Sequence, residues 1–209
     1  MNRKVERLRY TESNGQSCTK QQDYDSDKPC QKVQLDWRDT SNPTKPSPHL
    51  NTSTFDYALI SAPFTVVRSW RLPHSLPTTI TNAIQNLGYD SACKVALEYS
   101  TRFWEHYANP IIGGCSTTTD IPGIGTICYP SYDINGTGKA SILASYTTLD
   151  WPVSLGEEEH VRMVLDAMTE IHGEETRALY TGEYDRRCWS LDPLERAGWA
   201  NPSIGQHQL

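Results

Sequence analysis

The sequence has no long apolar run and no concentrated basic region. No stretch approaches the roughly 18 consecutive apolar residues of a membrane-spanning helix, and the N-terminus lacks the apolar core of a signal peptide. The 209 residues carry a net charge of −6, whereas nucleic-acid-binding proteins normally present a clustered basic surface. We therefore expect neither a membrane protein nor a nucleic-acid-binding protein. The sequence leaves the cellular location open between cytoplasmic and secreted.

Motifs of metal-dependent enzymes and of serine hydrolases are also missing. The six cysteines contain no CxxC pair, the six histidines contain no HExxH or HxH pattern, and no GxSxG turn is present. We expect no metal site. Cys93 and Cys128 lie in apolar runs and are predicted to be small buried hydrophobic residues. Cys18 and Cys30 flank a polar loop and would pair only in an oxidising compartment.

Two sequons for N-linked glycosylation are present. They begin at Asn51 (NTS) and Asn135 (NGT), and matches of this length often arise by chance. The sequence alone does not decide whether either asparagine is modified.

The N-terminal part of the chain is predicted to hold two strands separated by polar loops. Apolar and polar residues alternate over residues 4–10 and 32–38, and the turn-rich insertion between them, residues 11–31, completes a long β-hairpin. Residues 40–54 combine Pro, Ser, Asn and Thr without periodicity and are predicted to be a loop or linker. The apolar run over residues 55–64 ends after Ala-Pro and predicts a buried strand.

The central part is predicted to contain one helix and three strands. The segment LPTTITNAIQNLGY predicts an amphipathic helix that stops at Gly88. Strands are predicted over residues 93–100 and 139–147 from their β-branched and aromatic content. The intervening residues 110–139 are rich in Gly, Pro, Ser and Thr, with one short strand expected at 125–129. A loop of this length is usually functional or partly disordered.

The clearest helix is predicted to begin after Ser154. Ser154 and Glu157 form an S-x-x-E capping box, acidic side chains crowd the positive end of the helix, and Gly173 ends it. His160 and His172 on this helix are predicted to have surface or capping roles. The chain after the helix is aromatic and turn-rich. The apolar stripe of the helix consists of Val161, Val164, Leu165, Met168 and Ile171.

Predicted strands outnumber predicted helices, and the two do not alternate regularly. This order predicts an α+β fold, with a mixed β-sheet and helices packed on it, rather than a complete doubly wound nucleotide-binding domain.

One residue of the predicted sheet is unusual. Lys94 is charged within an apolar strand, flanked by Cys93 and Val95, so its ammonium must reach water, an acid or a ligand. A lysine that simply extends to the edge of the sheet is the structural alternative.

Three spaced motifs resemble those of flavin amine oxidases and L-amino-acid oxidases. Lys94 stands nine residues before Phe103 of a Phe-Trp pair, as a strand lysine does in that family. The segment GGCSTTTDIP, followed by CYP, is similar to a second family pattern, with one inserted Thr and with Cys128 in place of a tyrosine. RCWSLDP near the end resembles a third. The resemblance covers residues 4–208 and is closest to L-amino-acid oxidases of the fungal and bacterial type.

The resemblance implies FAD as the cofactor and assigns roles to individual residues. Lys94 would be the catalytic residue, hydrogen-bonding a water that faces the flavin, and Tyr129 would bind the substrate carboxylate. The other residues to which the resemblance gives a role would contact the cofactor, and they are Val5, Ala62, Pro63 and Trp189.

The resemblance also implies a division of the chain. Residues 1–70 would form part of an FAD-binding domain of incomplete Rossmann-like fold, with polar loops at 11–31 and 40–54. Residues 71–186 would form a substrate-binding domain, and residues 187–209 would begin the return into the FAD-binding domain. The Gly-rich loop that holds the FAD phosphates and the family's C-terminal FAD segment have no counterpart in the sequence. We therefore expect a truncated part of an oxidase.

The reaction implied by the resemblance is the oxidative deamination of an amine or L-amino acid by oxygen, which gives an imine or keto acid, ammonia and hydrogen peroxide. The cofactor would perform this chemistry while the protein orients the substrate. A homodimer or a separate complementing chain is the protein partner to consider. The alternative function is that of a noncatalytic binding module that retains only the substrate-domain fold.

Overall fold

The computed structural model divides the chain into two compact units. The first comprises Met1–Gly88 with Pro202–Leu209, and the second comprises Tyr89–Asn201. No helix among the described residues is long and apolar enough to cross a membrane. Cys18 and Cys30, which were expected to pair only in an oxidising compartment, fall outside the described residues. The structure describes residues 2–12, 32–42 and 44–206.

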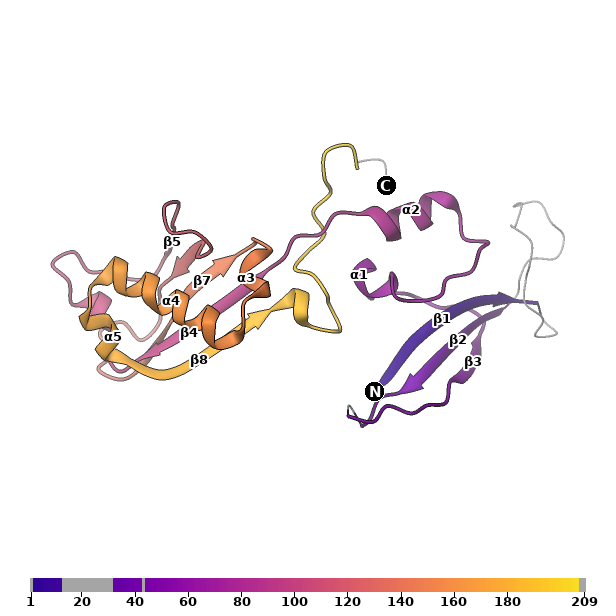
Figure 1. Cartoon of the computed structure of the whole chain (residues 1–209), viewed down its shortest axis with the longest axis horizontal. Helices are drawn as coiled ribbons and strands as arrows, with labels where there is room; N and C mark the ends of the chain where they lie inside the picture. Colours follow the sequence, from indigo (N-terminus) through magenta and orange to yellow (C-terminus); the bar gives the residue numbers. More distant parts are fainter. Residues whose placement is uncertain (1, 13–31, 43, 207–209) are drawn as a thin grey trace. The chain divides into compact units, whose positions relative to one another are not determined.

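The first unit contains a three-stranded antiparallel sheet (Figure 1). β1 (Arg3–Thr11) pairs with β2 (Lys32–Asp39), which also pairs with β3 (Asn51–Phe55). β1 and β2 confirm the strands predicted from alternating residues. β3 shows that the prediction of a loop was wrong over residues 51–54.

Hydrogen bonds between polar side chains hold β3 against β2. Because these side chains are polar, the sequence of β3 shows no apolar periodicity that would predict a strand. The Trp37 indole N–H donates a hydrogen bond to Ser53 Oγ at 2.9 Å, and Thr52 Oγ1 donates to Asp36 Oδ1 at 2.8 Å. Threonine also suits a strand because its β-branched side chain packs well on a pleated surface. β3 is an edge strand, so most of its side chains stay exposed without apolar cover.

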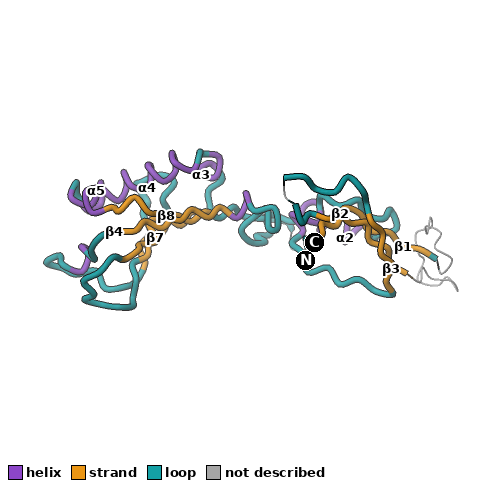
Figure 2. Tube along the Cα trace, turned by 90° about the horizontal axis from the view of Figure 1, so that it is seen from below, coloured by secondary structure: helices purple, strands orange, loops and turns teal. Residues whose placement is uncertain are grey.

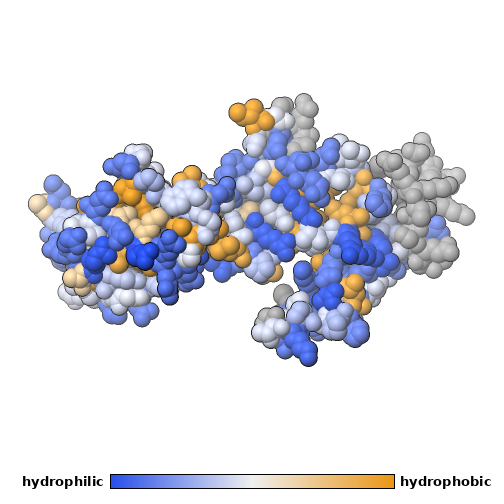
Figure 3. Space-filling view, in the orientation of Figure 1, coloured by the Kyte–Doolittle hydropathy of each residue, from blue (hydrophilic) through white to orange (hydrophobic). Residues whose placement is uncertain are grey.

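The apolar run that follows β3 is not the buried strand that was predicted. Of residues 55–64, only Phe55 belongs to a strand, and α1 (Phe64–Val67) begins at the other end of the run. Tyr57 and Leu59 are 91% and 97% exposed. No described strand pairs with residues 56–64, and an apolar sequence is buried only where a second surface covers it. Figure 3 shows hydrophobic patches on a mainly hydrophilic surface.

The predicted amphipathic helix is confirmed as α2 (Thr78–Asn86), which buries Ile84. Arg68 closes its C-terminal end by donating hydrogen bonds from Nε to the Ile84 carbonyl at 2.6 Å and from Nη2 to the Leu87 carbonyl at 2.5 Å. Carbonyls at a helix C-terminus have no partner within the helix, so the guanidinium replaces one. The helix ends at Asn86, with Leu87 in the C-cap position, two residues before the predicted stop at Gly88.

The second unit contains a five-stranded sheet in the order β5-β6-β7-β4-β8, in which neighbouring strands are antiparallel. β4, β6 and β7 confirm predicted strands, and both units together confirm the α+β class. The strands of this sheet are β4 (Cys93–Tyr99), β5 (Cys115–Thr117), β6 (Thr126–Cys128), β7 (Ala140–Thr147) and β8 (Tyr180–Cys188). The helical segments are η1 (Phe103–Glu105), α3 (Trp151–Ser154), α4 (Glu157–His172), α5 (Glu175–Leu179) and η2 (Trp189–Leu191).

β5 and β8 were not predicted. β8 pairs with β4 from Cys188 opposite Cys93 to Tyr180 opposite Tyr99. As an edge strand it leaves most of its side chains exposed, so its polar sequence, TGEYDRR, gives no apolar alternation. Pairing with β4, rather than local preference, makes this segment a strand.

α4 begins at a different residue from the predicted cap. Gly156 is the N-cap residue, and Ser154 Oγ donates to the carbonyl of Trp151 at 2.6 Å. The serine hydroxyl is therefore used within α3, and the predicted capping box does not form. The acidic residues do occupy the first turn of α4, and Gly173 ends the helix with a φ of 94°, which favours glycine.

The core of the second unit lies between α4 and one face of the sheet (Figure 2). In β4, Val95, Leu97 and Tyr99 are fully buried, while the alternate residues Lys94 and Glu98 are partly exposed. Because successive strand residues point to opposite faces, Lys94 points away from the core. The core residues from other segments include Trp104, Ile127, Ile142, Val161, Val164 and Met168.

Two disulfides join neighbouring strands of this sheet. Cys93 is bonded to Cys188 between β4 and β8, and Cys115 to Cys128 between β5 and β6. The partners are directly opposite in the strand register, with Cα atoms 4.0 and 4.1 Å apart. Cys93 and Cys128 were predicted to be simple buried hydrophobic residues. Cys93 is fully buried as predicted and Cys128 is partly buried, but neither is a simple hydrophobic residue, because the register places a second cysteine opposite each of them.

Candidate functional site

Lys94 lies on the sheet face that points away from α4. Its neighbours in sequence, Cys93 and Val95, are buried on the core side. The strand register places Tyr146 of β7 on one side of Lys94 and Arg187 of β8 on the other. The Lys94 ammonium lies 4.8 Å from the centre of the Tyr146 ring, within the range of a cation–π interaction.

A tryptophan extends this arrangement at each end. The Arg187 guanidinium carbon lies 4.9 Å from the centre of the Trp189 ring, and the Tyr146 and Trp199 rings meet edge to face with centres 6.2 Å apart. Trp199, Tyr146, Lys94, Arg187 and Trp189 thus form a row of neighbouring residues, two cations flanked by aromatic side chains, here called the cation–aromatic row. All five residues belong to the second unit.

The row places two cations opposite each other on neighbouring strands, which is an unfavourable arrangement in a sheet. Arg187 is ion-paired with Asp192. Among the described residues, none forms an ion pair with Lys94. The ammonium therefore contacts the Tyr146 ring and is otherwise free to bind water or an electron-rich ligand. A cation beside aromatic rings is an arrangement that some ligand-binding sites use.

Tyr129 lies on the other side of the sheet from Lys94. It is 8% exposed, belongs to the buried core together with Val95, and has its ring 6.2 Å from that of Trp104. Its hydroxyl is hydrogen-bonded to His172 Nε2 at 2.7 Å. The structure therefore does not bring Tyr129 and Lys94 together. If His172 Nε2 donates this bond, the hydroxyl can still donate its own hydrogen to a second partner.

His172 lies between two tyrosine hydroxyls. Besides the bond to Tyr129, its Nδ1 is 3.1 Å from the Tyr107 hydroxyl. Burial lowers the pKa of His172 and raises the pKa of Tyr129 to about 12, so both groups are neutral at physiological pH. A neutral imidazole donates at one ring nitrogen and accepts at the other, which matches two hydroxyl neighbours. The prediction of a surface or capping role was wrong for this histidine, because the pattern of α4 alone does not show what packs on it.

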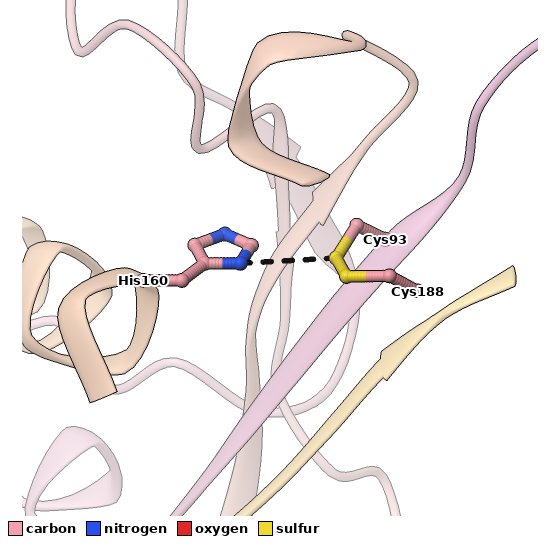
Figure 4. Close-up of side chains that lie close together, drawn as sticks. All are labelled: Cys93, His160 and Cys188. Atoms are coloured by element: carbon pink, nitrogen blue, oxygen red, sulfur yellow. Dashed lines mark hydrogen bonds between the residues drawn. A yellow bond between two sulfur atoms is a disulfide. The ribbon is translucent and has the colours of Figure 1, made fainter. Parts of the chain in front are cut away.

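His160 is also buried, which corrects its predicted surface or capping role. Figure 4 shows it beside the Cys93–Cys188 disulfide, and the ligand atoms of the three residues lie within 4.8 Å of one another. Arg186 Nε donates to His160 Nδ1 at 3.0 Å. The disulfide leaves neither sulfur as a thiolate, and the guanidinium faces the nitrogen that a metal would need. In this state the cluster cross-links β4 and β8 next to the cation–aromatic row.

The remaining residues with an implied cofactor role lie in the first unit. Val5 of β1 lies opposite Trp37 of β2, and both residues are partly buried. Ala62 and Pro63 immediately precede α1, and Pro63 occupies the N-cap position of that helix. Trp189 is the one cofactor residue implied by the sequence that shares the row with Lys94. The sequence did not identify Tyr146, Arg187 or Trp199, because their proximity to Lys94 depends on strand register.

Comparison with known sequences supports the family inferred from the motifs. Residues 2–209 match the family described as flavin containing amine oxidoreductase. The chain is 62% identical over 167 residues to the L-amino-acid oxidase of Neurospora crassa, covering 76% of this chain and 24% of that protein. It is 37% identical over 159 residues to the putative L-amino-acid oxidase YobN of Bacillus subtilis, covering 73% and 32%. The chain thus spans about a quarter to a third of the length of these curated relatives.

Solved structures share the fold. Cyclohexylamine oxidase from Brevibacterium oxydans superposes with a TM-score of 0.63 at 14% identity, over 96% of this chain and 37% of the other. A mutant of putrescine oxidase superposes with a TM-score of 0.66 at 11% identity, over 99% and 39%. At such identities the likeness concerns the fold alone. The match to the family over nearly the whole chain establishes that the chain belongs to the flavin-containing amine oxidoreductases.

Proposed function

We propose that the chain is part of an FAD-dependent L-amino-acid oxidase and contributes one wall of its active site. The observation that carries the proposal is the cation–aromatic row, in which Lys94 is held between Tyr146 and Arg187 without an acidic partner among the described residues. An amine is the alternative substrate, and the support for it is the membership of the chain in the flavin-containing amine oxidoreductases. The side chain of the substrate is not specified by these residues.

The row would suit the flat ring system of the flavin better than the rest of FAD. Trp189 and Tyr146 offer aromatic faces, and Lys94 offers a hydrogen-bond donor between them. By contrast, the two helices described in the first unit begin after Pro63 and Pro77, and no described helix begins with a Gly-rich phosphate-binding turn. Residues outside this chain would therefore hold the FAD phosphates.

When bound, the flavin would accept a hydride equivalent from the substrate and return the electrons to oxygen as hydrogen peroxide. The contribution of this chain would be positional. The Lys94 ammonium would donate a hydrogen bond to a water and hold it on the face of the row. The rings of Tyr146 and Trp199 would exclude other water from this face, which strengthens the electrostatic interactions of the ammonium.

The carboxylate of an amino-acid substrate has two candidate contacts. Tyr129 was assigned by the motif resemblance, and its hydroxyl is bound to His172. Tyr146 was not predicted, and it lies beside the Lys94 cation. Substitution of each tyrosine by phenylalanine distinguishes them. Loss of the true contact would raise KM for the L-amino acid, while KM for the matching amine, which lacks a carboxylate, would change little.

The division of labour along the chain is part of the same proposal. Residues 1–70 would belong to the FAD-binding domain, residues 71–186 to the substrate-binding domain, and residues 187–209 to the return segment. Val5, Ala62 and Pro63 would then contact the cofactor from the FAD-binding side. A complementing polypeptide or a second copy of the chain would complete the site.

The proposal is tested by complementation. The purified chain is mixed with FAD and with a second polypeptide that carries the remaining segments of an L-amino-acid oxidase, and flavin absorbance and peroxide release from L-amino acids are measured. We expect both signals only in the mixture. The variant Lys94→Met should lower peroxide release roughly 100-fold or more, in the range of a positioned proton-transfer group.

Lys139→Met is the matched control, because Lys139 is an exposed lysine of the same unit that pairs with Glu98. It should retain full activity. Equal activities of the Lys94 and Lys139 variants would remove Lys94 from the proposal. A mixture that never retains flavin would favour the alternative, a noncatalytic binding module, for which the exposed apolar residues Tyr57 and Leu59 offer a contact surface.

A further inference from the structure

The two disulfides of the second unit point to folding in an oxidising compartment. Cys93 and Cys188 are 0% and 5% exposed, so their bond lies within the fold rather than on its surface. Cys115 and Cys128 form the second bond between neighbouring strands. Such structural disulfides are rare in reducing compartments and common in secreted proteins. N-linked glycans are also a feature of secreted proteins, so a chain that folds in such a compartment could be glycosylated at either sequon.

The sequon at Asn51 is incorporated into a sheet. Asn51 opens β3 and pairs with Trp37 of β2 in the strand register. The hydroxyl that completes the sequon belongs to Ser53, which accepts the hydrogen bond from the Trp37 indole at 2.9 Å. Thr52, between them, donates to Asp36. Formation of the hairpin therefore occupies the sequon with sheet contacts.

The sequon at Asn135 lies in an exposed turn between β6 and β7. Asn135 and the sequon hydroxyl of Thr137 are both exposed. The turn closes through a hydrogen bond from the Gly136 N–H to the Asp133 carbonyl at 3.0 Å. Asn135 itself has a φ of 62°, a left-handed conformation that asparagine tolerates better than most residues. No described residue is hydrogen-bonded to its side-chain amide.

The backbone under this side chain is firmly anchored. The Asn135 N–H donates to Glu105 Oε2 at 2.8 Å, and Glu105 is buried in an ion pair with Arg102. Arg102 in turn donates to the carbonyl of Tyr132 at 2.9 Å. The turn is thus fixed to the core from below, while the Asn135 amide projects outward. A bulky group on that amide would displace no packed side chain.

We propose that Asn135 is an N-linked glycosylation site and is preferred over Asn51. The donor would be an oligosaccharide carried on a polyprenyl diphosphate. The Asn135 amide nitrogen forms a bond to the first sugar carbon and loses a proton, while the bond from that carbon to the diphosphate breaks and the polyprenyl diphosphate leaves. This inference concerns a surface turn and does not depend on the proposed oxidase function.

The test uses the 209-residue chain behind a cleavable secretion signal, translated in the presence of endoplasmic-reticulum microsomes. A glycan slows the chain on a denaturing gel, and a glycosidase that removes N-linked glycans reverses the shift. Peptide mass spectrometry of the treated chain then identifies the asparagine. Because the gel reads attachment in chains of any folding state, variants that fold poorly remain informative.

We expect most translocated chains to shift, with the modified asparagine at position 135. Asn135→Gln and Thr137→Ala should both abolish that modification, and the second does so without changing the acceptor residue. Ser53→Ala, which removes the other sequon, should leave the shift largely intact. An unmodified Asn135 in translocated chains, or a higher occupancy at Asn51 than at Asn135, would overturn the proposal.

Discussion

In the three-stranded sheet a buried carboxylate holds the strands together, whereas in the five-stranded sheet an apolar core and two disulfides do so. Asp36 of β2 is 4% exposed and accepts hydrogen bonds from Arg9 of β1 at 2.7 Å and from Thr52 of β3 at 2.8 Å. In the second unit, Val95 and Leu97 of β4 are fully buried beneath α4.

This difference determines what each sheet depends on. The contacts of Asp36 require an ionised carboxylate, so the first sheet is sensitive to acid. Apolar burial and covalent bonds do not require an ionised carboxylate, so the register of β4 does not depend on one, and acid acts on the second unit through the buried His160 instead. The cation–aromatic row takes its residues from β7, β4, β8 and the chain that follows. It is therefore built on the sheet whose register is the more strongly secured.

The largest expected effect comes from removing the Cys93–Cys188 disulfide. Its cysteines are 95 positions apart in sequence, whereas those of Cys115–Cys128 are 13 apart. Because the loop-closure entropy grows with loop length, the first bond should stabilise the fold by about 4–5 kcal/mol and the second by about 3 kcal/mol. Denaturant unfolding of the two double alanine variants, followed by circular dichroism, measures both losses. Equal losses would show that loop closure is not what separates them.

Acidification should next weaken the second unit through His160. Burial, together with the adjacent Arg186, lowers the pKa of His160 to about 4. Since this lies below the unfolded value of about 6.5, the stabilisation is complete above about pH 6.5 and is lost as the pH falls toward 4, by about 3 kcal/mol. Hydrogen exchange of β4 amides across this range reports the loss. His160→Gln should flatten the dependence, and an unchanged slope in that variant would assign the titration to another group.

Asp36→Asn should have a somewhat smaller effect, confined to the first unit. Burial opposes ionisation of Asp36, but hydrogen bonds from Thr52 and Arg9 outweigh it and lower the pKa. The stabilisation is therefore present above the unfolded value of about 3.9 and is lost as the pH falls through the lower folded value. At neutral pH the substitution should cost about 1–3 kcal/mol. Faster exchange is expected for β2 amides, and an equal acceleration in β4 would contradict the separation between the two sheets.

The smallest effect is expected for Lys94→Met, which should stabilise the second unit by about 0.2–1 kcal/mol. The change removes a cation directly opposite Arg187, and methionine still covers the Tyr146 ring. Lys139→Met, which breaks the exposed pair with Glu98, should instead destabilise by at most about 1 kcal/mol. Denaturant midpoints decide between the two signs. A large destabilisation by Lys94→Met would indicate a structural lysine rather than a functional one.

Several elements were predictable because their patterns are local. β4, α2 and the apolar stripe of α4 follow from the spacing of residues within one segment, and Gly173 ends α4 through its own backbone conformation. Ser154 shows the limit of a local rule. The S-x-x-E pattern is present, but the Ser154 hydroxyl donates to the carbonyl of Trp151 in α3, and Gly156 is the N-cap of α4.

The candidate site was predictable only in part. Lys94 was identified because a charge within an apolar strand is unusual, and Trp189 because it lies in a motif of the resemblance. Tyr146 lay within a correctly predicted strand, yet its position beside Lys94 follows from the pairing of β7 with β4. Arg187 lies in β8, which was not predicted because its polar sequence shows no apolar alternation. Tyr129 was assigned from its motif, and its packing in the core beside His172 depends on contacts that the motif does not contain.

Local sequence was therefore sufficient for the strand that carries Lys94, for the helix that covers the opposite face, and for the family to which the chain belongs. Tertiary structure alone decided which side chains surround the ammonium and which cysteines are bonded. The reason is that strand register joins residues far apart in sequence. It depends on cross-strand hydrogen bonds and on the fit of buried side chains, and neither is recorded in the preferences of a single segment.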